Sequence, residues 1–295
     1  MLTTQFTGNK RHLITGDGEM GELIRNFNWS NTALGSFEKW PQSLYTAVNL
    51  CLNSRFPMVL WWGKDLVKIY NDAYSIMLGT KHPHALGATG KEVWPEIWHI
   101  IGPMLESVLQ TGKATWSDNQ LLLLHRNGFT EECYFTFSYS PVYGENDKVE
   151  GVFCAVTETT DAVTVERQLQ TLTNLGKNIL NLTGDLEVYQ KSIEVIKQNP
   201  RDFPFALIYE VSRDGKKLSL ADKTSEDLGL FFPYEIDLDK HASQFHGLAD
   251  VAKGNAPVIA DDLMQRFGNL PTGAWDSAIH TAFVLPVAHS QQKIP

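Results

Sequence analysis

Three glycines near the start of the chain have the spacing of a phosphate-binding loop. Gly16, Gly18 and Gly21 form G-x-G-x-x-G, the pattern in which backbone N–H groups at a helix start bind a dinucleotide pyrophosphate. That chemistry needs a βαβ unit around the glycines. Only residues 12–14 resemble a preceding strand, and no second parallel strand follows the short helix expected at 22–27. The sequence therefore predicts a turn that leads into a helix.

A lone histidine and a pair of acids are the other candidates for chemistry. His99 is a candidate axial haem ligand, because neutral imidazole binds iron well. A histidine satisfied by its neighbours is the interpretation that we favour, so haem is not expected. Asp261 and Asp262 precede an expected helix, where paired carboxylates more often cap the helix than bind metal. We expect no metal site.

Motifs of the common catalytic sites are absent from residues 1–295. The sequence has no P-loop, no H-E-x-x-H and no G-x-S-x-G. It also has no phospho-acceptor histidine box, no ATP-binding motif of a histidine kinase and no receiver-domain aspartate cluster. These residues leave open whether the protein is an enzyme, and we assign no catalytic residue.

Composition indicates two globular cores. The 295 residues are 43% hydrophobic and 20% charged, which is ordinary for a protein of two domains. Seven of the eight tryptophans precede Gln120, so the two cores differ. A net charge of -9 excludes the basic face of a nucleic-acid-binding protein, and no apolar run is long enough for a membrane span. The absence of a signal peptide and of close cysteine spacings predicts a cytoplasmic protein with no membrane partner.

The stretch 55–79 is the element that would position a binding site. Two short apolar runs on either side of the turn Gly63–Asp65 predict a hairpin. Asn71 or Asp72 can then cap a short helix, and Gly79 stands where a left-handed stop is wanted. A hairpin followed by a capped short helix is typical of a small α+β sensor unit.

Further strands are predicted after residue 110. Residues 81–110 are expected to form short helices broken by Pro83, Pro95 and Pro103. Asn127-Gly128 is a type I′ turn signal between strands 114–125 and 129–142, and the second of these strands alternates with one apolar face, formed by Cys133, Phe135, Phe137 and Tyr139.

The last strand of this half is expected to be central. A turn at 144–148 leads into strand 149–157, whose apolar residues fall on both faces. A strand that is covered on both sides explains this pattern. The helical extension that we expect within 23–54 is the predicted cover of one face.

These motifs together resemble the N-terminal PAS domain of bacterial hybrid sensor histidine kinases. The resemblance covers about Gly18 to Leu175 and is carried by GEMG, SRFPMVLWWG, YNDAY, KHP, EVWPEIW and FSYSPVY, in that order. It implies an α+β fold, with an antiparallel sheet, flanking helices and an N-terminal helical extension. It also implies a ligand cavity between helices and sheet, with candidate lining residues Trp61, Tyr70, Tyr74, Trp94, Trp98, His99 and Tyr134. In the alternative interpretation, these aromatic residues form a solid core.

A connector helix is expected to follow the sheet. Glu158-Thr159-Thr160 stands where PAS domains end in an Asp-Ile-Thr-type motif, although the acid here is Glu and the middle residue is Thr. Beyond it, apolar residues recur at spacings of four and three: Val165, Leu169, Leu172, Leu175, Ile179 and Leu182. Such a seam favours a parallel coiled coil, but it is short and contains Gly176, so burial against its own domains is the alternative. We expect a homodimer through this helix, and signal coupling by Glu158, Thr160, Leu169, Leu172, Leu175 and Ile179.

The second half has the element order of a GAF domain. A helix from Leu186 ends before Asn199-Pro200, and a buried strand is expected at 205–211. Asp214-Gly215 turns into strand 217–221, and further strands are expected at 256–259 and 282–287. This half contains no cysteine for a covalent bilin, and the chain has no Asn-Cys-Arg-Phe flavin motif. The last strand is expected to lack a partner, so we expect a GAF-like domain that is incomplete at its C-terminus.

The expected organisation has four segments. Residues 1–54 are the helical extension, 55–160 the PAS domain, 161–184 the connector helix and 185–295 the GAF-like domain. The resemblance implies a sensory input module of a two-component histidine kinase, which acts with downstream kinase domains and a response regulator. Two alternatives are a non-catalytic PAS–GAF interaction scaffold and an input module for another output, such as a cyclic-dinucleotide enzyme or a phosphatase. The sequence identifies neither ligand nor cofactor.

Overall fold

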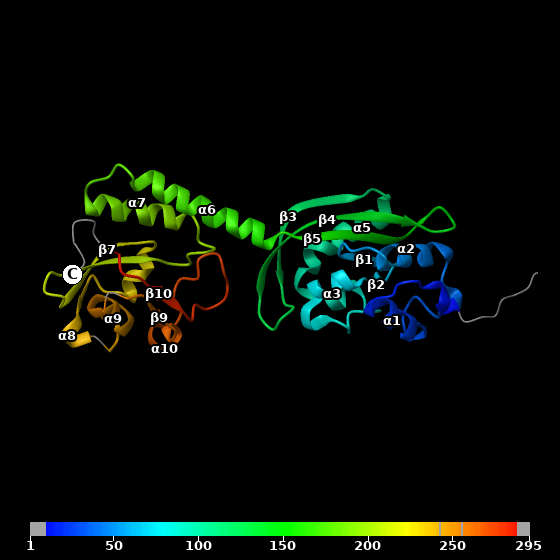
Figure 1. Ribbon diagram of the computed structural model, residues 1–295, viewed down its shortest axis with the longest axis horizontal. Coiled ribbons are helices and arrows are strands. Elements are labelled where there is room, and N and C mark those ends of the chain that lie inside the picture. Colours follow the sequence, from blue (N-terminus) through cyan, green and yellow to red (C-terminus); the bar gives the residue numbers. More distant parts are fainter. Residues whose placement is uncertain (1–9, 242, 255, 288–295) are drawn as a thin grey trace, which may run out of the picture. The chain divides into compact units, whose positions relative to one another are not determined.

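The structure is a computed structural model that describes residues 10–241, 243–254 and 256–287 (Figure 1). It divides into two compact units, Met1–Thr164 and Val165–Pro295. The first nine residues of the expected helical extension and the last eight of the expected GAF-like segment lie outside the described residues.

Unit 1 begins with helices α1 (Glu19–Asn26) and α2 (Gln42–Leu52). Gly18 stands at the cap position of α1, which confirms the predicted turn into a helix. A side chain at Gly18 would collide with the Asp72 carboxylate. That carboxylate instead accepts a hydrogen bond from the Met20 N–H, at 2.9 Å between Oδ1 and N. The glycine therefore allows α1 to approach Asp72 closely.

The centre of unit 1 is a five-stranded sheet. Its strands are β1 (Met58–Trp62), β2 (Val67–Tyr70), β3 (Thr115–Leu124), β4 (Glu131–Tyr143) and β5 (Val149–Glu158). They pair antiparallel in the order β2-β1-β5-β4-β3. The prediction that the last strand is central is thus confirmed. Unit 1 is thus an α+β unit with an antiparallel sheet and flanking helices, as the sequence predicted.

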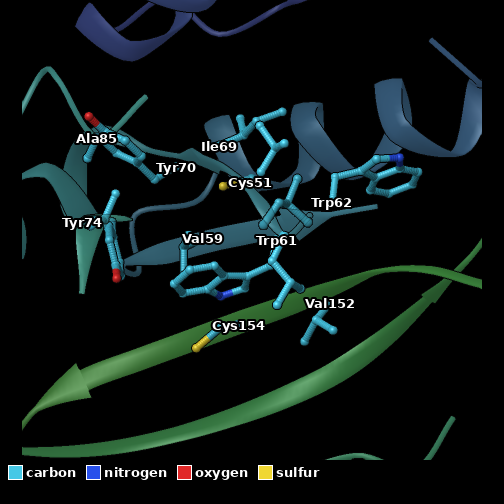
Figure 2. Packing of buried hydrophobic residues seen from close by; sticks show 14 of the residues in the cluster. Cys51, Val59, Trp61, Trp62, Ile69, Tyr70, Tyr74, Ala85, Val152 and Cys154 are labelled. Atoms are coloured by element: carbon cyan, nitrogen blue, oxygen red, sulfur yellow. The ribbon is translucent and has the colours of Figure 1, made fainter. Parts of the chain in front are cut away.

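Helices cover both faces of this sheet. Helix α2 packs against β1, β2 and β4, which confirms the predicted cover from the N-terminal extension. In Figure 2, Trp62 and Ile69 lie on the side of α2, whereas Trp61 points the other way, toward Tyr74 and Cys154. On that second side lie α3 (Asp72–Leu78), α4 (Gly90–Val93) and α5 (Trp98–Thr111).

Two local predictions in unit 1 are wrong. The β3–β4 connection is a loop of residues 125–130, not a two-residue type I′ turn: Gly128 has a φ of +89°, but Asn127 is not left-handed. The Arg126 carbonyl accepts hydrogen bonds from the N–H and hydroxyl of Thr80, at 2.9 and 2.7 Å, so a tertiary contact shapes the loop. Pro103 lies inside α5 without ending it, because a proline removes only one backbone donor and the buried face of the helix holds the rest.

Helix α6 (Thr160–Ile179) begins in unit 1 and continues into unit 2. Helix α7 (Asp185–Lys197) follows and ends before Asn199, as predicted. A three-stranded antiparallel sheet contains β6 (Leu207–Val211), β7 (Lys217–Lys223) and β8 (Glu235–Asp237). Strand β6 is the half-exposed edge of this sheet, so the prediction of a buried strand there is wrong.

The end of unit 2 consists of short elements. Helices α8 (Leu238–His241), α9 (His246–Gly254) and α10 (Leu263–Phe267) accompany strands β9 (Val258–Ala260) and β10 (Ala282–Val284). Strand β10 pairs antiparallel with β9. The expectation that the final strand has no partner is therefore wrong: the partner is supplied by an earlier segment of the chain.

Candidate functional site

Unit 1 contains a cavity of about 50 Å³ between the sheet and the helices of its second side. Fourteen side chains line it, and they come from β1, α3, the segment 94–101 and strands β3 to β5. Almost all are aromatic or aliphatic: Val59, Trp61, Tyr74, Met77, Trp94, Ile97, Ile101, Leu122, Leu124, Phe135, Phe137, Tyr139, Cys154 and Val156. An apolar cavity beside a few polar groups has the composition of a small-molecule site.

Three of the seven residues proposed from the sequence line this cavity, namely Trp61, Tyr74 and Trp94. They meet there because Trp61 projects from β1 and faces helix α3 (Figure 2), while Trp94 follows α4. Burial raises the pKa of Tyr74 above its ordinary range, so this phenol stays protonated at neutral pH.

The other four proposed residues are not among the lining side chains. Tyr70 is fully buried, and its hydroxyl lies 3.0 Å from Nδ1 of His82. Trp98 packs over Gly90 and Gly102, and His99 is exposed on α5. Tyr134 alternates along β4 with the lining residues of that strand, and its hydroxyl donates to Glu132 at 2.8 Å.

Lys68 lies beside the cavity and was not singled out from the sequence. It is fully buried in β2, opposite Trp61 in the strand register. Its Nζ lies 4.5 Å from the ring centroid of Trp61, 4.8 Å from that of Trp94 and 5.3 Å from that of Tyr74. No sequence signal marked it, because a lysine in a short strand is ordinary and only the structure shows that all four residues of β2 are buried. Lysine is almost never fully buried unless it is paired.

Asn71, at the end of β2, holds the other side of the sheet together. Its Oδ1 accepts hydrogen bonds from the N–H groups of Met58 and Tyr74, both at 3.0 Å. Its Nδ2 donates to the carbonyls of Cys51, Ser54 and Phe56, at 2.7 to 3.1 Å. The expected cap of α3 is confirmed, and the same side chain also fixes the connection from α2 to β1.

The end of β5 forms a polar junction with the β3–β4 loop. The Arg126 guanidinium donates two hydrogen bonds to the Glu158 carboxylate, at 2.8 and 2.9 Å, and one to Glu131 at 3.1 Å. The Thr160 hydroxyl donates to Glu158 and accepts from the Tyr134 N–H, both at 3.0 Å. The residues at both ends of the Glu158–Thr160 motif thus join the loop, β4 and the first turn of α6.

Electrostatics favour the charged form of this junction. Burial opposes ionisation of Glu158, but the hydrogen bonds and charge of Arg126 outweigh it and lower the pKa of the carboxyl. Glu158 in turn raises the pKa of Arg126. Arg126 was not singled out from the sequence, because its partner Glu158 is 32 residues away.

The predicted seam of α6 has its first members exposed in this chain. The side chains of Val165, Leu169 and Leu172 are more than half exposed, and Leu175 and Ile179 are half-buried. The opposite side of the helix is held within unit 2 by Thr171, which accepts a hydrogen bond from Asn199 at 3.0 Å. Helix α6 ends at Ile179, before the predicted seam residue Leu182.

Comparison with known proteins gave similarities only among solved structures, since no protein-family model and no curated protein matches the chain. The chain is similar to a sensory box sensor histidine kinase from Vibrio cholerae, with 17% identity and a TM-score of 0.30 over 40% of this chain and 92% of that one. It is also similar to a PAS domain from Colwellia psychrerythraea, with 16% identity and a TM-score of 0.32 over 40% of this chain and 98% of that one. A LOV protein from Rhodobacter sphaeroides is similar with 12% identity and a TM-score of 0.35 over 53% of this chain and 92% of that one. At these values the similarities transfer no function to this chain.

Within the described part of the chain, no helix combines the length and the apolar character needed to cross a bilayer.

Proposed function

We propose that the chain is the sensory input module of a two-component sensor histidine kinase. A signal received in the unit 1 cavity would be passed along β5 to the Arg126–Glu158 junction and from there to helix α6. The proposal is supported by the ordered PAS motifs of the sequence and by the contacts that lead from the cavity along β5 to helix α6.

One observation carries the proposal: β5 touches both the cavity and the junction. Cys154 and Val156 line the cavity, and Glu158, two residues further on, is held by Arg126. Helix α6 starts at Thr160. Arg126 also donates to the carbonyl of Met77, another residue that lines the cavity, at 3.3 Å. A change in cavity packing therefore has a short covalent and hydrogen-bonded route to the start of α6.

The proposed mechanism is a shift between two arrangements of α6. A ligand can shift such an equilibrium only by as much as its affinity differs between the two states. In this proposal, the exposed residues Val165, Leu169 and Leu172 pair with a second copy of the chain in one state. Unit 2 would be a GAF-like domain between this helix and downstream kinase domains, which would pass phosphate to a response regulator.

The route from cavity to helix is tested by filling the cavity. Ile101→Trp adds volume at the cavity wall, and we expect it to change amide hydrogen exchange in residues 160–179. Leu50→Trp adds the same side chain at an exposed position of α2 and should leave that exchange unchanged. Equal exchange profiles in Ile101→Trp and the natural protein would contradict the proposed route, provided that Ile101→Trp is folded by circular dichroism.

The kinase part is tested on the protein that the complete reading frame encodes. Incubation with γ-labelled ATP should give acid-labile phosphohistidine, and Glu158→Gln should change the rate of labelling. A reading frame without a phospho-acceptor helix and an ATP-binding domain would contradict the kinase assignment and favour the interaction scaffold.

A further inference from the structure

The cavity is bordered by a buried lysine whose amine has no counter-ion within hydrogen-bond reach among the described residues. Lys68 is fully buried, and its Nζ has no hydrogen-bond partner among residues 10–241, 243–254 and 256–287. A buried charge is normally paired, because an unpaired one forfeits its hydration without compensation. The position of Lys68 therefore calls for a specific explanation.

The lysine side chain lies on the cavity side of the sheet. Lys68 and Trp61 are direct partners across β2 and β1, so their side chains leave the sheet on the same face. Trp61 lines the cavity, as do Tyr74 and Trp94. All three rings surround Nζ at 4.5 to 5.3 Å, so the cation lies just behind the cavity wall.

A second donor in the same wall is also unpaired. The indole Nε1 of Trp61 is buried, and the described part of the chain offers it no hydrogen-bond acceptor. Two unpaired donors, one of them cationic, thus lie next to a cavity whose remaining walls are mainly apolar, for example Ile97, Ile101 and Val156. This arrangement complements a molecule with an anionic, acceptor-rich end and a hydrocarbon body.

We propose that the cavity binds a small organic carboxylate, whose charged end lies against Trp61 and is balanced by the amine of Lys68 behind that ring. The hydrocarbon part of the ligand contacts the apolar wall on the side of Ile97, Ile101 and Val156. This inference rests on the proposed function, because it assigns a ligand class to the cavity that would receive the signal.

The cavity selects against larger and more highly charged anions. A water needs roughly 10–15 Å³ of such space and occupies about 30 Å³ in the liquid. A cavity of about 50 Å³ therefore has room for roughly three to five waters, which together have about the volume of butyrate or benzoate. Phosphate presents more charge and more acceptors than one lysine and one indole can satisfy, and its transfer to an apolar wall is unfavourable.

The protonation of Lys68 fits this assignment. Burial lowers its pKa well below the ordinary range, and the nearby Lys81 lowers it further. A bound carboxylate would supply the opposite charge that favours the protonated amine. Glu96 and the Cys154 thiol, the other titratable groups that act on Lys68, do not fill this role: Glu96 is paired with Lys81 at 2.6 Å, and burial keeps the thiol neutral by raising its pKa.

The test is isothermal titration calorimetry of the whole chain with benzoate, butyrate and benzamide. Benzamide has nearly the shape of benzoate but no charge, so it separates the apolar contacts from the ion pair. Lys68→Met removes the ammonium with little change in volume, and Lys64→Met makes the same change at an exposed position of the same hairpin. Circular dichroism confirms that both variants are folded.

We expect benzoate or butyrate to bind the natural protein and Lys64→Met alike, and to bind Lys68→Met about ten-fold or more weakly. Benzamide should bind the natural protein more weakly than benzoate and should lose little in Lys68→Met. Failure of both acids to bind at about 10 mM, or equal binding to natural protein and Lys68→Met, would overturn the inference.

Two results separate this inference from the proposed function. If benzamide binds as tightly as benzoate, the carboxylate assignment is wrong but the cavity remains a ligand site. If benzoate binds through Lys68 and hydrogen exchange in residues 160–179 does not change, the carboxylate assignment holds and the route to α6 is wrong.

Discussion

Two buried polar side chains, one inside β2 and one directly after it, differ in whether they are hydrogen-bonded. Asn71 is 1% exposed and makes five hydrogen bonds. Lys68, three residues earlier, is 0% exposed, and its ammonium makes none with any residue that the structure describes. A satisfied buried group fixes one structure, whereas an unsatisfied one destabilises the protein until something pairs with it. Asn71 therefore belongs to the scaffold of unit 1, and Lys68 belongs to its candidate site.

The largest change in the free energy of unfolding is expected for substitution of Asn71, the side chain of the two that is fully hydrogen-bonded. Asn71→Ala leaves backbone groups at the α2–β1 connection without partners, and we expect a loss of about 3–4 kcal/mol in the free energy of unfolding. Urea unfolding followed by tryptophan fluorescence reports mainly on unit 1, where seven of the eight tryptophans lie. Asn53→Ala, at an exposed position, is the control. A loss below about 1 kcal/mol for Asn71→Ala would show that the hydrogen-bond network is not essential to the scaffold.

The junction at the end of β5 should behave like Asn71, with a smaller effect. Glu158→Gln removes the charge that pairs with Arg126, and we expect a loss of about 1–2 kcal/mol, because the Glu158 side chain is 27% exposed. The exposed Glu106→Gln on α5 is the matched control.

The same ion pair predicts a dependence on acid. The folded-state pKa of Glu158 is lowered, so its contribution is present above the unfolded-state value of about 4.3 and is lost as the pH falls through the folded-state pKa. The stability difference between natural protein and Glu158→Gln should shrink in acid. A difference that stays constant down to about pH 2 would contradict the ion pair.

Substitution of Lys68 should raise the free energy of unfolding, whereas substitution of Asn71 lowers it. Lys68→Met replaces a buried amine that has no hydrogen-bond partner among the described residues with an apolar group of similar shape, so we expect a gain of about 1 kcal/mol in the free energy of unfolding without ligand. The exposed Lys64→Met should stay within about 0.5 kcal/mol. A loss of stability in Lys68→Met would show that the rings of Trp61, Tyr74 and Trp94 already satisfy the cation.

The gain in the free energy of unfolding of Lys68→Met should depend on pH. The pKa of Lys68 is lowered in the folded state, so the folded protein binds fewer protons at this side chain than the unfolded chain does. The destabilisation by Lys68 is therefore full below the folded-state pKa and fades as the pH rises toward about 10.4. Urea unfolding of natural protein and Lys68→Met across this range should show a gain that shrinks with rising pH.

The smallest effect on stability is expected at the exposed seam of α6. There, apolar side chains are exposed to water, whereas Lys68 is a polar side chain buried in the protein. Leu172 is 65% exposed, so Leu172→Asp should change the free energy of unfolding by less than about 0.5 kcal/mol. If a second copy covers the seam, the substitution should convert dimer to monomer in sedimentation equilibrium. The exposed Gln170→Asp adds the same charge off the seam and should leave the association unchanged. A chain that is monomeric at every concentration before substitution would remove the seam from the mechanism.

Local patterns in the sequence determined most of the elements. The turn chemistry around Gly63, the Asn71 cap and the alternation along β4 are set by residues close to one another in the chain, so period and cap signals identify them directly. The apolar character of both faces of β5 was enough to predict a central strand. Trp61, Tyr74 and Trp94 were expected at a cavity from the resemblance to PAS domains, together with four residues that do not line it.

Only the tertiary structure decided which polar groups are paired. The β3–β4 loop takes its shape from Thr80, and Arg126 finds Glu158 across 32 residues; no local signal encodes such contacts. Strand β10 obtains its partner from β9, which the order of elements did not reveal. Lys68 reads in the sequence as an ordinary strand lysine. Its burial among three rings, with no acceptor within reach in the described chain, follows from packing alone, since desolvation depends on every element that surrounds a side chain.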